Sequence, residues 1–352
     1  MKKLTKQSVG MDCAKDELAV AFKTIDSDYE SKTVASKTFR NDKSGYQALL
    51  NWSKKLREQK LKVSFVIEAT GVYHESVALF LYEHKEEISV ILPNKIKHFA
   101  GTEKIKTVND KVSAQTIAQF GLEKKLDLWE PPHEVYNYLR QLSRERDQLN
   151  QELTQVKNQL HAEQAGAWPN KGSVTRMKQR LKLIDKQKED IEEEIKQLVK
   201  DTKWLKEKID HVCTIKGVGL ITAVTVIAET NGFHLIKNKK QLVSYAGLDV
   251  QCKDSGTSVH HKPRISRKGN KYLRKSVYFP ALSAIRSEDK MKNMFVRLVS
   301  KHGIKMKAAV AVQRKLLELI YTLWKKNEDF DPDYTANKKV RAATGAALNE
   351  MA

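Results

Sequence analysis

The stretch Val63-Ser64-Phe65-Val66-Ile67-Glu68 is a short apolar run whose only charge stands at its carboxyl end. Such a run predicts a buried β-strand, and Ala69-Thr70-Gly71 then turns the chain away. Ser8-Val9-Gly10-Met11-Asp12 has the same form, an apolar run closed by an acid, and a second run follows at residues 18–22. This pair of runs predicts the first hairpin of a sheet.

Three acids therefore stand at the ends of predicted elements. Asp12 and Glu68 end strands, and Asp110 opens a predicted helix. Acids separated by tens of residues converge only through the fold, and hard oxygen ligands brought together in this way are what Mg²⁺ needs. The arrangement predicts a metal-dependent phosphoryl-transfer site. Taken singly, Asp12 can instead cap a turn and Asp110 can cap a helix, and these alternatives stay open.

The chain is long and strongly basic. Its 352 residues are enough for two or three domains, and its formal net charge is +21. Between residues 253 and 325, 18 Lys and Arg stand against 4 Asp and Glu, so most of the excess belongs to one region. Such clustering indicates a surface for a polyanion, with nucleic acid as the first candidate. Solubilising charge spread over many surfaces is the weaker interpretation.

The cysteines and the apolar content bear on location. Cys13, Cys213 and Cys252 are far apart and fit neither a metal site nor a disulfide framework, which indicates reduced thiols. No apolar stretch approaches the roughly 20 residues of a membrane helix, and residues 1–6 lack the apolar core of a signal peptide. We expect a cytoplasmic protein with no membrane segment.

The composition changes along the chain. Residues 7–125 alternate strand-like and helix-like segments, including a helix near residues 72–84 and a strand at residues 88–92, and this is typical of an α/β domain. Pro131-Pro132 marks a boundary. The sequence predicts an α/β domain over residues 1–130, a coiled-coil arm over 131–210, a mainly helical domain over 211–330 and a tail over 331–352.

The middle of the chain carries apolar residues at steps of three and four, in two series. The series are Leu139, Leu142, Leu149, Leu153, Val156 and Leu160, then Met177, Leu181, Ile184, Ile191, Ile195, Leu198, Leu205 and Ile209. They predict two long antiparallel helices joined across residues 166–172. Arg146, Lys188 and Thr202 interrupt the apolar seam. A dimerisation arm or spacer and an ordinary intramolecular hairpin explain the pattern about equally well.

Two stretches further on predict contact with nucleic acid. Gly217 and Gly219 precede an apolar helix at residues 220–229 and resemble the hairpin of helix-hairpin-helix motifs, in which backbone N–H groups bind phosphate. A tight structural turn explains these glycines about as well. A basic run then leads into another helix. Its candidate phosphate contacts, for which solvated helix charge is the alternative, are Arg264, Arg267, Lys268, Lys271 and Arg274.

Eight short motifs follow one another in an order that resembles one known family. They are Gly10-Met11-Asp12-Cys13-Ala14-Lys15, Glu68-Ala69-Thr70-Gly71-Val72-Tyr73, Asn94-Lys95-Ile96-Lys97-His98-Phe99-Ala100, Asp110-Lys111-Val112-Ser113-Ala114, Ile215-Lys216-Gly217-Val218-Gly219, Tyr245-Ala246-Gly247-Leu248, Ser255-Gly256 and Ser266-Arg267-Lys268-Gly269. The set resembles the DEDD transposases of bacterial insertion sequences, in insertion-sequence family one hundred and ten, which also includes Piv-like DNA invertases. The resemblance covers nearly the whole chain.

The resemblance implies a RuvC-like N-terminal domain of ribonuclease H fold, a coiled coil, and a domain with a serine nucleophile. Members recombine DNA through a covalent serine–DNA intermediate, and many are guided by a structured bridge RNA. Carried over, Asp12, Glu68 and Asp110 are Mg²⁺ ligands and Ser255 is the nucleophile. The family's site is composite between protomers, so the resemblance implies a DNA transposase that acts as a homodimer or homotetramer in the bacterial cytoplasm.

One position departs from the family pattern. Where the family has a further aspartate, three residues after Asp110 on the same helix face, this chain has Ser113. A hydroxyl can ligate a metal or hold a metal-bound water, but it brings no negative charge, so weaker metal affinity is expected. This position motivates one rival function, a catalytically impaired nucleic-acid-binding derivative of a transposase. A separate rival is a RuvC-like nuclease that hydrolyses DNA with water and uses the C-terminal region only for binding. Ser255 has its own alternative, since Asp254-Ser255-Gly256 also favours a simple turn.

Overall fold

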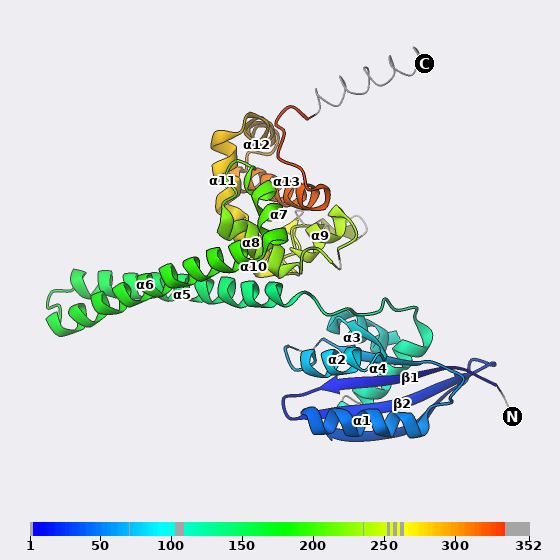
Figure 1. Cartoon of the computed structure of the whole chain (residues 1–352). Coiled ribbons are helices and arrows are strands. Elements are labelled where there is room, and N and C mark those ends of the chain that lie inside the picture. The colour runs from blue at the N-terminus through cyan, green and yellow to red at the C-terminus, as the bar shows by residue number, and fades with distance from the viewer. Residues whose placement is uncertain are drawn as a thin grey trace, which may run out of the picture. The chain divides into compact units, whose positions relative to one another are not determined.

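The computed structural model describes residues 3–69, 71–102, 109–234, 236–251, 254–255, 259–260 and 264–334. The chain divides into two compact units, Met1–Pro131 and Pro132–Ala352, and Figure 1 shows one sheet in the first unit and helices throughout the second. The mixed α/β class with a sheet and mostly helical content is therefore confirmed. None of the described helices combines the length and the apolar character that a membrane span requires.

A five-stranded sheet forms the centre of the first unit. Its strands are β1 (Leu4–Cys13), β2 (Glu17–Asp26), β3 (Ser31–Arg40), β4 (Val63–Glu68) and β5 (Glu87–Ile91), in the order β3-β2-β1-β4-β5. The first three strands are antiparallel neighbours, whereas β4 runs parallel to both β1 and β5. The predicted hairpin is confirmed by the pairing of β1 with β2, and the predicted buried strand is β4.

Helices cover both faces of this sheet because its strands are apolar on both sides. Phe65 of β4 packs with α1 (Lys43–Leu56) and α2 (Glu75–Glu83). Its neighbour Val66 packs with α3 (Pro93–Thr102) and α4 (Asp110–Glu123) on the other face. Successive side chains of a strand point to opposite faces, so one short apolar run supplies two cores.

Helix α4 lies unusually close to β1. A Cβ added at Gly10 would stand 2.2 Å from the backbone nitrogen of Ala118, and one added at Gly121 would stand 2.4 Å from Ser8 Oγ. Both glycines are therefore required by close approach of helix and strand, since any side chain would push the two apart. Gly10 lies against Ala118 and Ser8 lies against Gly121, so α4 and β1 run in opposite directions. The start of α4 therefore lies near the carboxyl end of β1.

The second unit begins with two long helices that lie side by side, α5 (Glu134–Ala165) and α6 (Lys171–Asp201) (Figure 1). We expected the second helix to run through Ile209, and this was wrong: it ends at Asp201, and α7 (Lys203–Cys213) begins after Thr202. Thr202 has φ −99° and ψ 82°, and its hydroxyl donates to the carbonyl of Leu198 at 3.0 Å. The side chain thus satisfies a carbonyl of the last turn, where a helix lacks backbone donors.

One of the interruptions in the apolar seam is explained by a charge pair. Arg146 of α5 donates through Nε to Glu192 Oε1 of α6 at 2.7 Å, so a polar bridge replaces an apolar contact between the helices. Val156, Ile184, Ile191 and Ile195 are buried along the same hairpin. Within one chain the two helices therefore pack on each other, and a role in dimerisation stays a prediction.

The remaining helices follow α8 (Leu220–Glu229), which coincides with the predicted apolar helix. They are α9 (Lys239–Tyr245), α10 (Lys271–Ser276), α11 (Tyr278–Ser287), α12 (Asp289–His302) and α13 (Lys305–Lys326). Two small antiparallel ribbons stand between α9 and α10 in the sequence, β6 (Val250–Gln251) with β9 (Arg264–Ile265), and β7 (Asp254–Ser255) with β8 (Val259–His260). Of the predicted tail, residues 335–352 lie outside the described residues.

Candidate active site and nucleic-acid interface

The three predicted acids are placed by neighbouring elements of the first unit. Asp12 is the penultimate residue of β1, and Glu68 is the last residue of β4. Because these strands are parallel neighbours, with Met11 opposite Ile67, both acids stand at the same edge of the sheet. Asp110 is the first residue of α4, which the glycine contacts hold against β1.

The surroundings of Asp12 connect it with α4. Burial raises the pKa of the Asp12 carboxyl, and the charge of Asp110 raises it further. Hydrogen bonds from the Ser113 hydroxyl and from the Cys13 backbone N–H act in the opposite direction, because they stabilise the carboxylate. Two acids from distant parts of the sequence therefore repel each other at this edge, and Ser113 donates to one of them.

Glu68 joins this group through its effect on Cys13. Burial, followed by the charges of Asp12 and Glu68, raises the pKa of the Cys13 thiol to about 12. The thiol is therefore protonated at neutral pH and is no metal ligand in that form. All four predicted metal-binding residues, Asp12, Glu68, Asp110 and Ser113, lie in one neighbourhood.

The donor set suits a hard cation. Carboxylate and hydroxyl oxygens are the ligands that Mg²⁺ prefers, and a cation between Asp12 and Asp110 would remove their mutual repulsion. Within the described ranges, no three His, Cys, Asp or Glu side chains stand close enough to enclose an ion. Electrostatic coupling acts over longer distances than direct ligation. The acids are therefore near enough for Asp110 to raise the pKa of Asp12, but in this arrangement the described residues offer no three such side chains close enough to bind one ion.

Asp110 is not the cap of its helix, contrary to one of the two readings of the sequence. The N-cap is Asn109, whose side chain accepts from the backbone N–H of Val112 at 2.9 Å. Asp110 is exposed and is the first residue of the first helical turn, after the cap. The turn closes where the Ser113 backbone N–H donates to the carbonyl of Asn109. The capping requirement is met by another residue, so it does not account for Asp110.

The predicted nucleophile lies in the second unit. Ser255 belongs to the two-residue strand β7 and pairs with Val259 of β8. Short cross-strand pairing holds the backbone here, although residues 256–258 and 261–263 lie outside the described residues, as does the side chain of Ser255.

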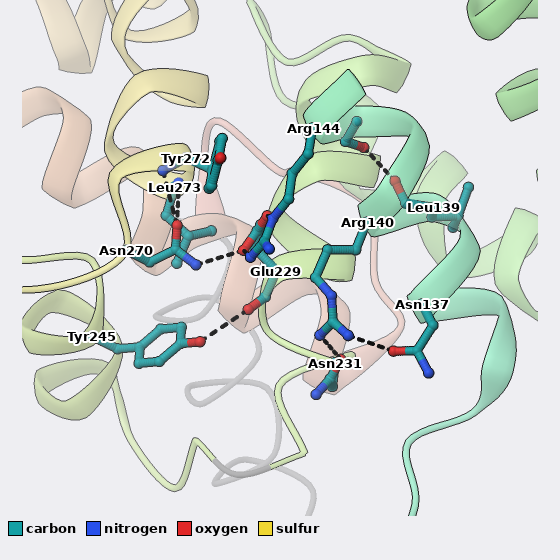
Figure 2. A network of polar contacts seen from close by, with 11 residues as sticks. Asn137, Leu139, Arg140, Arg144, Glu229, Asn231, Tyr245, Asn270, Tyr272 and Leu273 are labelled. Atoms are coloured by element: carbon teal, nitrogen blue, oxygen red, sulfur yellow. Dashed lines mark hydrogen bonds and ion pairs between the residues drawn. The ribbon is translucent and has the colours of Figure 1, made fainter. Parts of the chain in front are cut away.

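A buried glutamate holds together the two ends of the segment that carries Ser255, through its carboxylate and its backbone carbonyl. Glu229, at the end of α8, accepts from Asn270 Nδ2 at 2.6 Å, and its backbone carbonyl accepts from the Tyr245 hydroxyl at 3.3 Å (Figure 2). The backbone N–H of Asn270 also donates to the carbonyl of Tyr245 at 2.7 Å. Tyr245 and Asn270 are therefore neighbours in space, so the segment of residues 246–269 begins and ends at the same point of the unit.

The charge of Glu229 is compensated by the hairpin. Arg144 of α5 donates from Nε and Nη2 to the two carboxylate oxygens, at 2.7 and 2.9 Å, and its guanidinium lies 4.8 Å from the centre of the Tyr272 ring (Figure 2). Glu229, Arg144 and Asn270 were not among the residues predicted from the sequence. The signal that could have found the first is a single acid at the end of an otherwise apolar helix, since buried acids require partners.

The five predicted phosphate-binding side chains have different surroundings. Arg264, Arg267 and Lys268 are exposed. Lys271 is also exposed, with its ammonium 5.0 Å from the centre of the Tyr272 ring. Arg274 instead donates from Nη1 to the carbonyl of Ala246 at 2.8 Å, so its guanidinium also fastens the base of the 246–269 segment.

The two predicted glycines also differ. Gly217 has φ +92°, and a Cβ there would stand 2.8 Å from the carbonyl oxygen of Pro280 in α11. Tight packing and backbone conformation thus both require glycine at this position. Gly219 precedes α8 and has open space around it, so nothing in the described structure prevents a ligand from approaching its backbone.

Comparison with known proteins extends these observations. Residues 9–169 match the transposase domain called DEDD_Tnp_IS110, and residues 209–295 match the domain described as transposase of the IS116/IS110/IS902 family. The chain is similar to the pilin gene-inverting protein of Moraxella bovis, with 26% identity over 93% of this chain and 98% of that protein. It is also similar to the transposase for insertion sequence element IS1111A of Coxiella burnetii, with 29% identity over 40% of this chain and 38% of that protein.

Two solved structures are similar to part of the chain. A Thermus thermophilus RuvC structure has 10% identity and a TM-score of 0.28, covering 35% of this chain and 99% of that one. RuvC in complex with a Holliday junction substrate has 10% identity and a TM-score of 0.25, covering 32% of this chain and 90% of that one.

The two matched transposase domains, over residues 9–169 and 209–295, lie in order and together span most of the sequence. The chain belongs to the IS110 family of transposases.

Proposed function

We propose that this protein recombines DNA by a covalent route, with Asp12, Glu68 and Asp110 as ligands of Mg²⁺ and Ser255 as the nucleophile. The observation that carries the proposal is the convergence of the acids on one sheet edge, where Asp110 opposes ionisation of Asp12. Family membership supports the reaction class. The similar protein of Moraxella bovis is, by its name, one that inverts the pilin gene.

The metal ligands have distinct duties. Asp12 is partly buried, and hydrogen bonding by the Ser113 hydroxyl and the Cys13 backbone N–H stabilises its carboxylate. Asp110 is exposed and can adjust to an incoming ion. When bound, a divalent cation would polarise the scissile phosphate and stabilise the charge on its oxygens. Ser113 keeps Asp12 oriented but adds no charge.

The covalent step balances without a cofactor. The Ser255 hydroxyl loses its proton to a base, and its oxygen bonds to phosphorus while the bond from phosphorus to one DNA sugar oxygen breaks and that oxygen gains a proton. Rejoining reverses these changes with the hydroxyl of another strand. Each broken bond is replaced by one of the same kind, so no nucleoside triphosphate is needed, and the sequence has no Gly-x-x-x-x-Gly-Lys loop.

We further propose that the basic surface of residues 253–325 binds DNA and a bridge RNA, and that a homodimer or homotetramer brings acids and serine to one phosphodiester. The concentration of Lys and Arg in that region and the exposure of Arg264, Arg267 and Lys268 support binding to phosphates. The closed base formed by Tyr245 and Asn270 supports the idea that Ser255 is presented on a separately held segment.

The test is a search for a covalent adduct. Purified protein is incubated with Mg²⁺, guide RNA, and donor and target DNA, and a protein–DNA species that survives denaturation is sought. We expect Ser255→Ala to abolish the adduct and strand exchange, and Ser258→Ala, three residues further on, to leave both in place. Mapping the adduct to Ser255 by peptide mass analysis completes the assignment.

The same experiment separates the two rivals. A nuclease that uses water would cleave DNA equally well after Ser255→Ala and would form no adduct. A catalytically impaired derivative would bind nucleic acid but neither cleave nor join it, in the original chain as well as in the variant. The second rival is motivated by Ser113, because three acids bind a cation less strongly than four.

A further inference from the structure

The far end of the α5–α6 hairpin is a basic tip with an exposed tryptophan. Trp168, with 94% of its surface exposed, lies in the turn between the end of α5 at Ala165 and the start of α6 at Lys171. Figure 1 shows this turn at the end of the hairpin that points away from α8 and α10. We define the tip as residues 157–184. Its basic residues, all exposed, are Lys157, Lys171, Arg176, Lys178, Arg180 and Lys182.

The charge of the tip contrasts with that of the rest of the hairpin. Residues 157–184 carry 6 Lys and Arg against 1 acid, whereas residues 134–156 and 185–201 together carry 7 Lys and Arg against 11 acids. A solubilising surface would mix both signs along the helices. The positive charge is instead gathered at one end, around the exposed ring.

Internal contacts do not use this charge. Among the described residues, the ion pairs of α6 lie nearer its other end, where Glu192 pairs with Arg146 and Glu193 pairs with Lys196. None of the six tip cations forms an ion pair with a described residue. The single acid, Glu163, accepts from the backbone N–H of Asn170 at 2.7 Å. Its negative charge therefore closes the turn and leaves the cations unneutralised.

The turn that carries Trp168 is held in place. Glu163 bridges to Asn170, and the Asn170 side chain accepts from the backbone N–H of Ser173 at 3.0 Å as the cap of α6. Pro169 restricts the backbone next to the ring. An aromatic side chain on a fixed turn loses little conformational freedom when it binds, which is the condition for an effective stacking platform.

We propose that this tip binds single-stranded DNA, with Trp168 stacked on an unpaired base and the neighbouring cations in contact with the phosphates. Stacking on an aromatic ring between basic residues is the usual way in which proteins hold single strands without reading sequence. A duplex hides the faces of its bases, so the ring selects an unpaired strand. Lys171, Lys178 and Lys182 lie on one face of α6 at helical spacing and offer successive charges.

The rival occupant is the acidic half of another hairpin in a second copy of the chain. Among the described residues, four of its eleven acids already form ion pairs, including Glu192 with Arg146, Asp185 with Lys188, and Asp147 with Lys275. A polyanion whose charges are all available therefore complements the tip better. The proposal concerns binding alone and does not depend on the catalytic assignment of Ser255.

The test uses the full chain and an oligodeoxythymidine of about 20 nucleotides, a length that exceeds the usual site of one binding module. Trp168→Leu keeps an apolar side chain but removes the flat ring, and we expect it to weaken binding at least about fivefold, because one stacked base contributes on the order of a kcal/mol or more. Trp168→Phe keeps a ring and should retain most of the affinity. Equal affinity of wild type and Trp168→Leu would overturn the proposal.

A matched pair of triple variants tests the charge. Lys171→Ala, Lys178→Ala and Lys182→Ala together remove three tip cations, and Lys186→Ala, Lys196→Ala and Lys200→Ala remove three exposed cations from the other end of the same helix. Affinity falls as salt rises, and the first set should make the slope of log affinity against log salt less steep by about 2. The second set should leave this slope unchanged. Identical slopes for the two sets would contradict the proposal.

Two further outcomes identify a different occupant. If Trp168→Leu changes the molar mass measured by light scattering while the affinity for the oligonucleotide stays the same, the tip contacts a second copy of the chain. If the variants weaken binding of oligouridine but not of oligodeoxythymidine, the tip binds RNA. Either result rejects single-stranded DNA as the partner.

Discussion

Asp12 and Glu229 are two partly or fully buried acids with opposite surroundings. In the first unit, Asp12 faces another acid, and its pKa is raised by burial and by Asp110. In the second unit, Glu229 receives a bidentate Arg144 and the amide of Asn270. The net effect of the surroundings opposes the negative charge of Asp12, whereas Arg144 and Asn270 compensate the negative charge of Glu229.

The difference separates the proposed metal site from a site that holds the fold. A folded chain gains nothing from placing like charges together, and the proposed cation would account for the arrangement around Asp12. A paired and hydrogen-bonded buried charge gives a well-defined geometry, and removing one partner leaves the other uncompensated. Substitutions should therefore have opposite consequences in the two places.

The largest expected effect concerns catalysis at Asp12. We expect Asp12→Asn to reduce strand cleavage at least about a thousandfold, because a neutral amide cannot supply the ligand charge, while binding to nucleic acid is largely retained. Cleavage assays and filter binding on the same preparation measure both quantities. A parallel loss of cleavage and binding would show that the acids and the nucleic-acid surface are not separate.

The second effect is on the stability of the helical unit. Glu229→Ala should lower the free energy of unfolding by about 2 to 4 kcal/mol, because Arg144 and Asn270 lose their buried acceptor. Denaturant unfolding followed by circular dichroism measures the change. Glu318→Ala is the control, since Glu318 pairs with Arg314 across one helix turn near the surface and should cost less than about 1 kcal/mol. Similar losses in both variants would count against a special role of Glu229.

The third effect is on the packing that brings α4 to β1. Gly10→Ala places a Cβ where the backbone of Ala118 stands, and overpacking of this kind costs about 1 to 3 kcal/mol or more. Gly101→Ala is the matched control, because no atom lies within 4 Å of the added Cβ. Thermal unfolding should show a clear loss only for Gly10→Ala, and an unchanged midpoint there would mean that helix and strand are not in tight contact.

A fourth, smaller effect tests the missing acid. Ser113→Asp adds a negative charge beside Asp12, so the variant should be less stable than wild type in chelator and should gain more stability when Mg²⁺ is added. A tenfold gain in affinity corresponds to about 1.4 kcal/mol of additional stabilisation at saturating metal. Thermal shift with and without Mg²⁺ measures it. If both proteins respond alike to the ion, position 113 does not face the metal.

The smallest effect is a pH dependence of stability. The folded-state pKa of Asp12 lies above its ordinary value of 3.8, so between these values the folded chain holds more protons than the unfolded chain. Stability contributed by this group therefore falls as pH rises through the window and stays lower above it. Asp12→Asn lacks this loss, and its melting temperature relative to wild type should rise with pH. A constant difference across the range would refute the raised pKa of Asp12.

Local features of the fold were predictable because a few neighbouring residues determine them. The strand at residues 63–68 and the helix at residues 220–229 follow from apolar patterns bounded by a charge or by glycine, and both have the predicted limits. The end of α6 before Thr202 was not predictable from periodicity, because the apolar series continues past it to Leu205 and Ile209.

Contacts between distant residues were predictable only in part. The order of motifs indicated that Asp12 and Asp110 meet, but the glycines that allow α4 to approach β1 and the hydrogen bond from Ser113 depend on three-dimensional packing. The partners of Glu229 come from three separate elements, and no local pattern connects them. Polar networks of this kind are visible only after the fold is known.

The backbone hydrogen bond between Asn270 and Tyr245 joins the two ends of residues 246–269, as at the base of an insertion. Ala246 and Leu248 inside this stretch are buried in the core of the helices, whereas β6 and β9 pair further out. The chain between β6 and β9 can therefore lengthen, shorten or change composition without disturbing the helices, and an engineer could exchange that part for a counterpart from a relative.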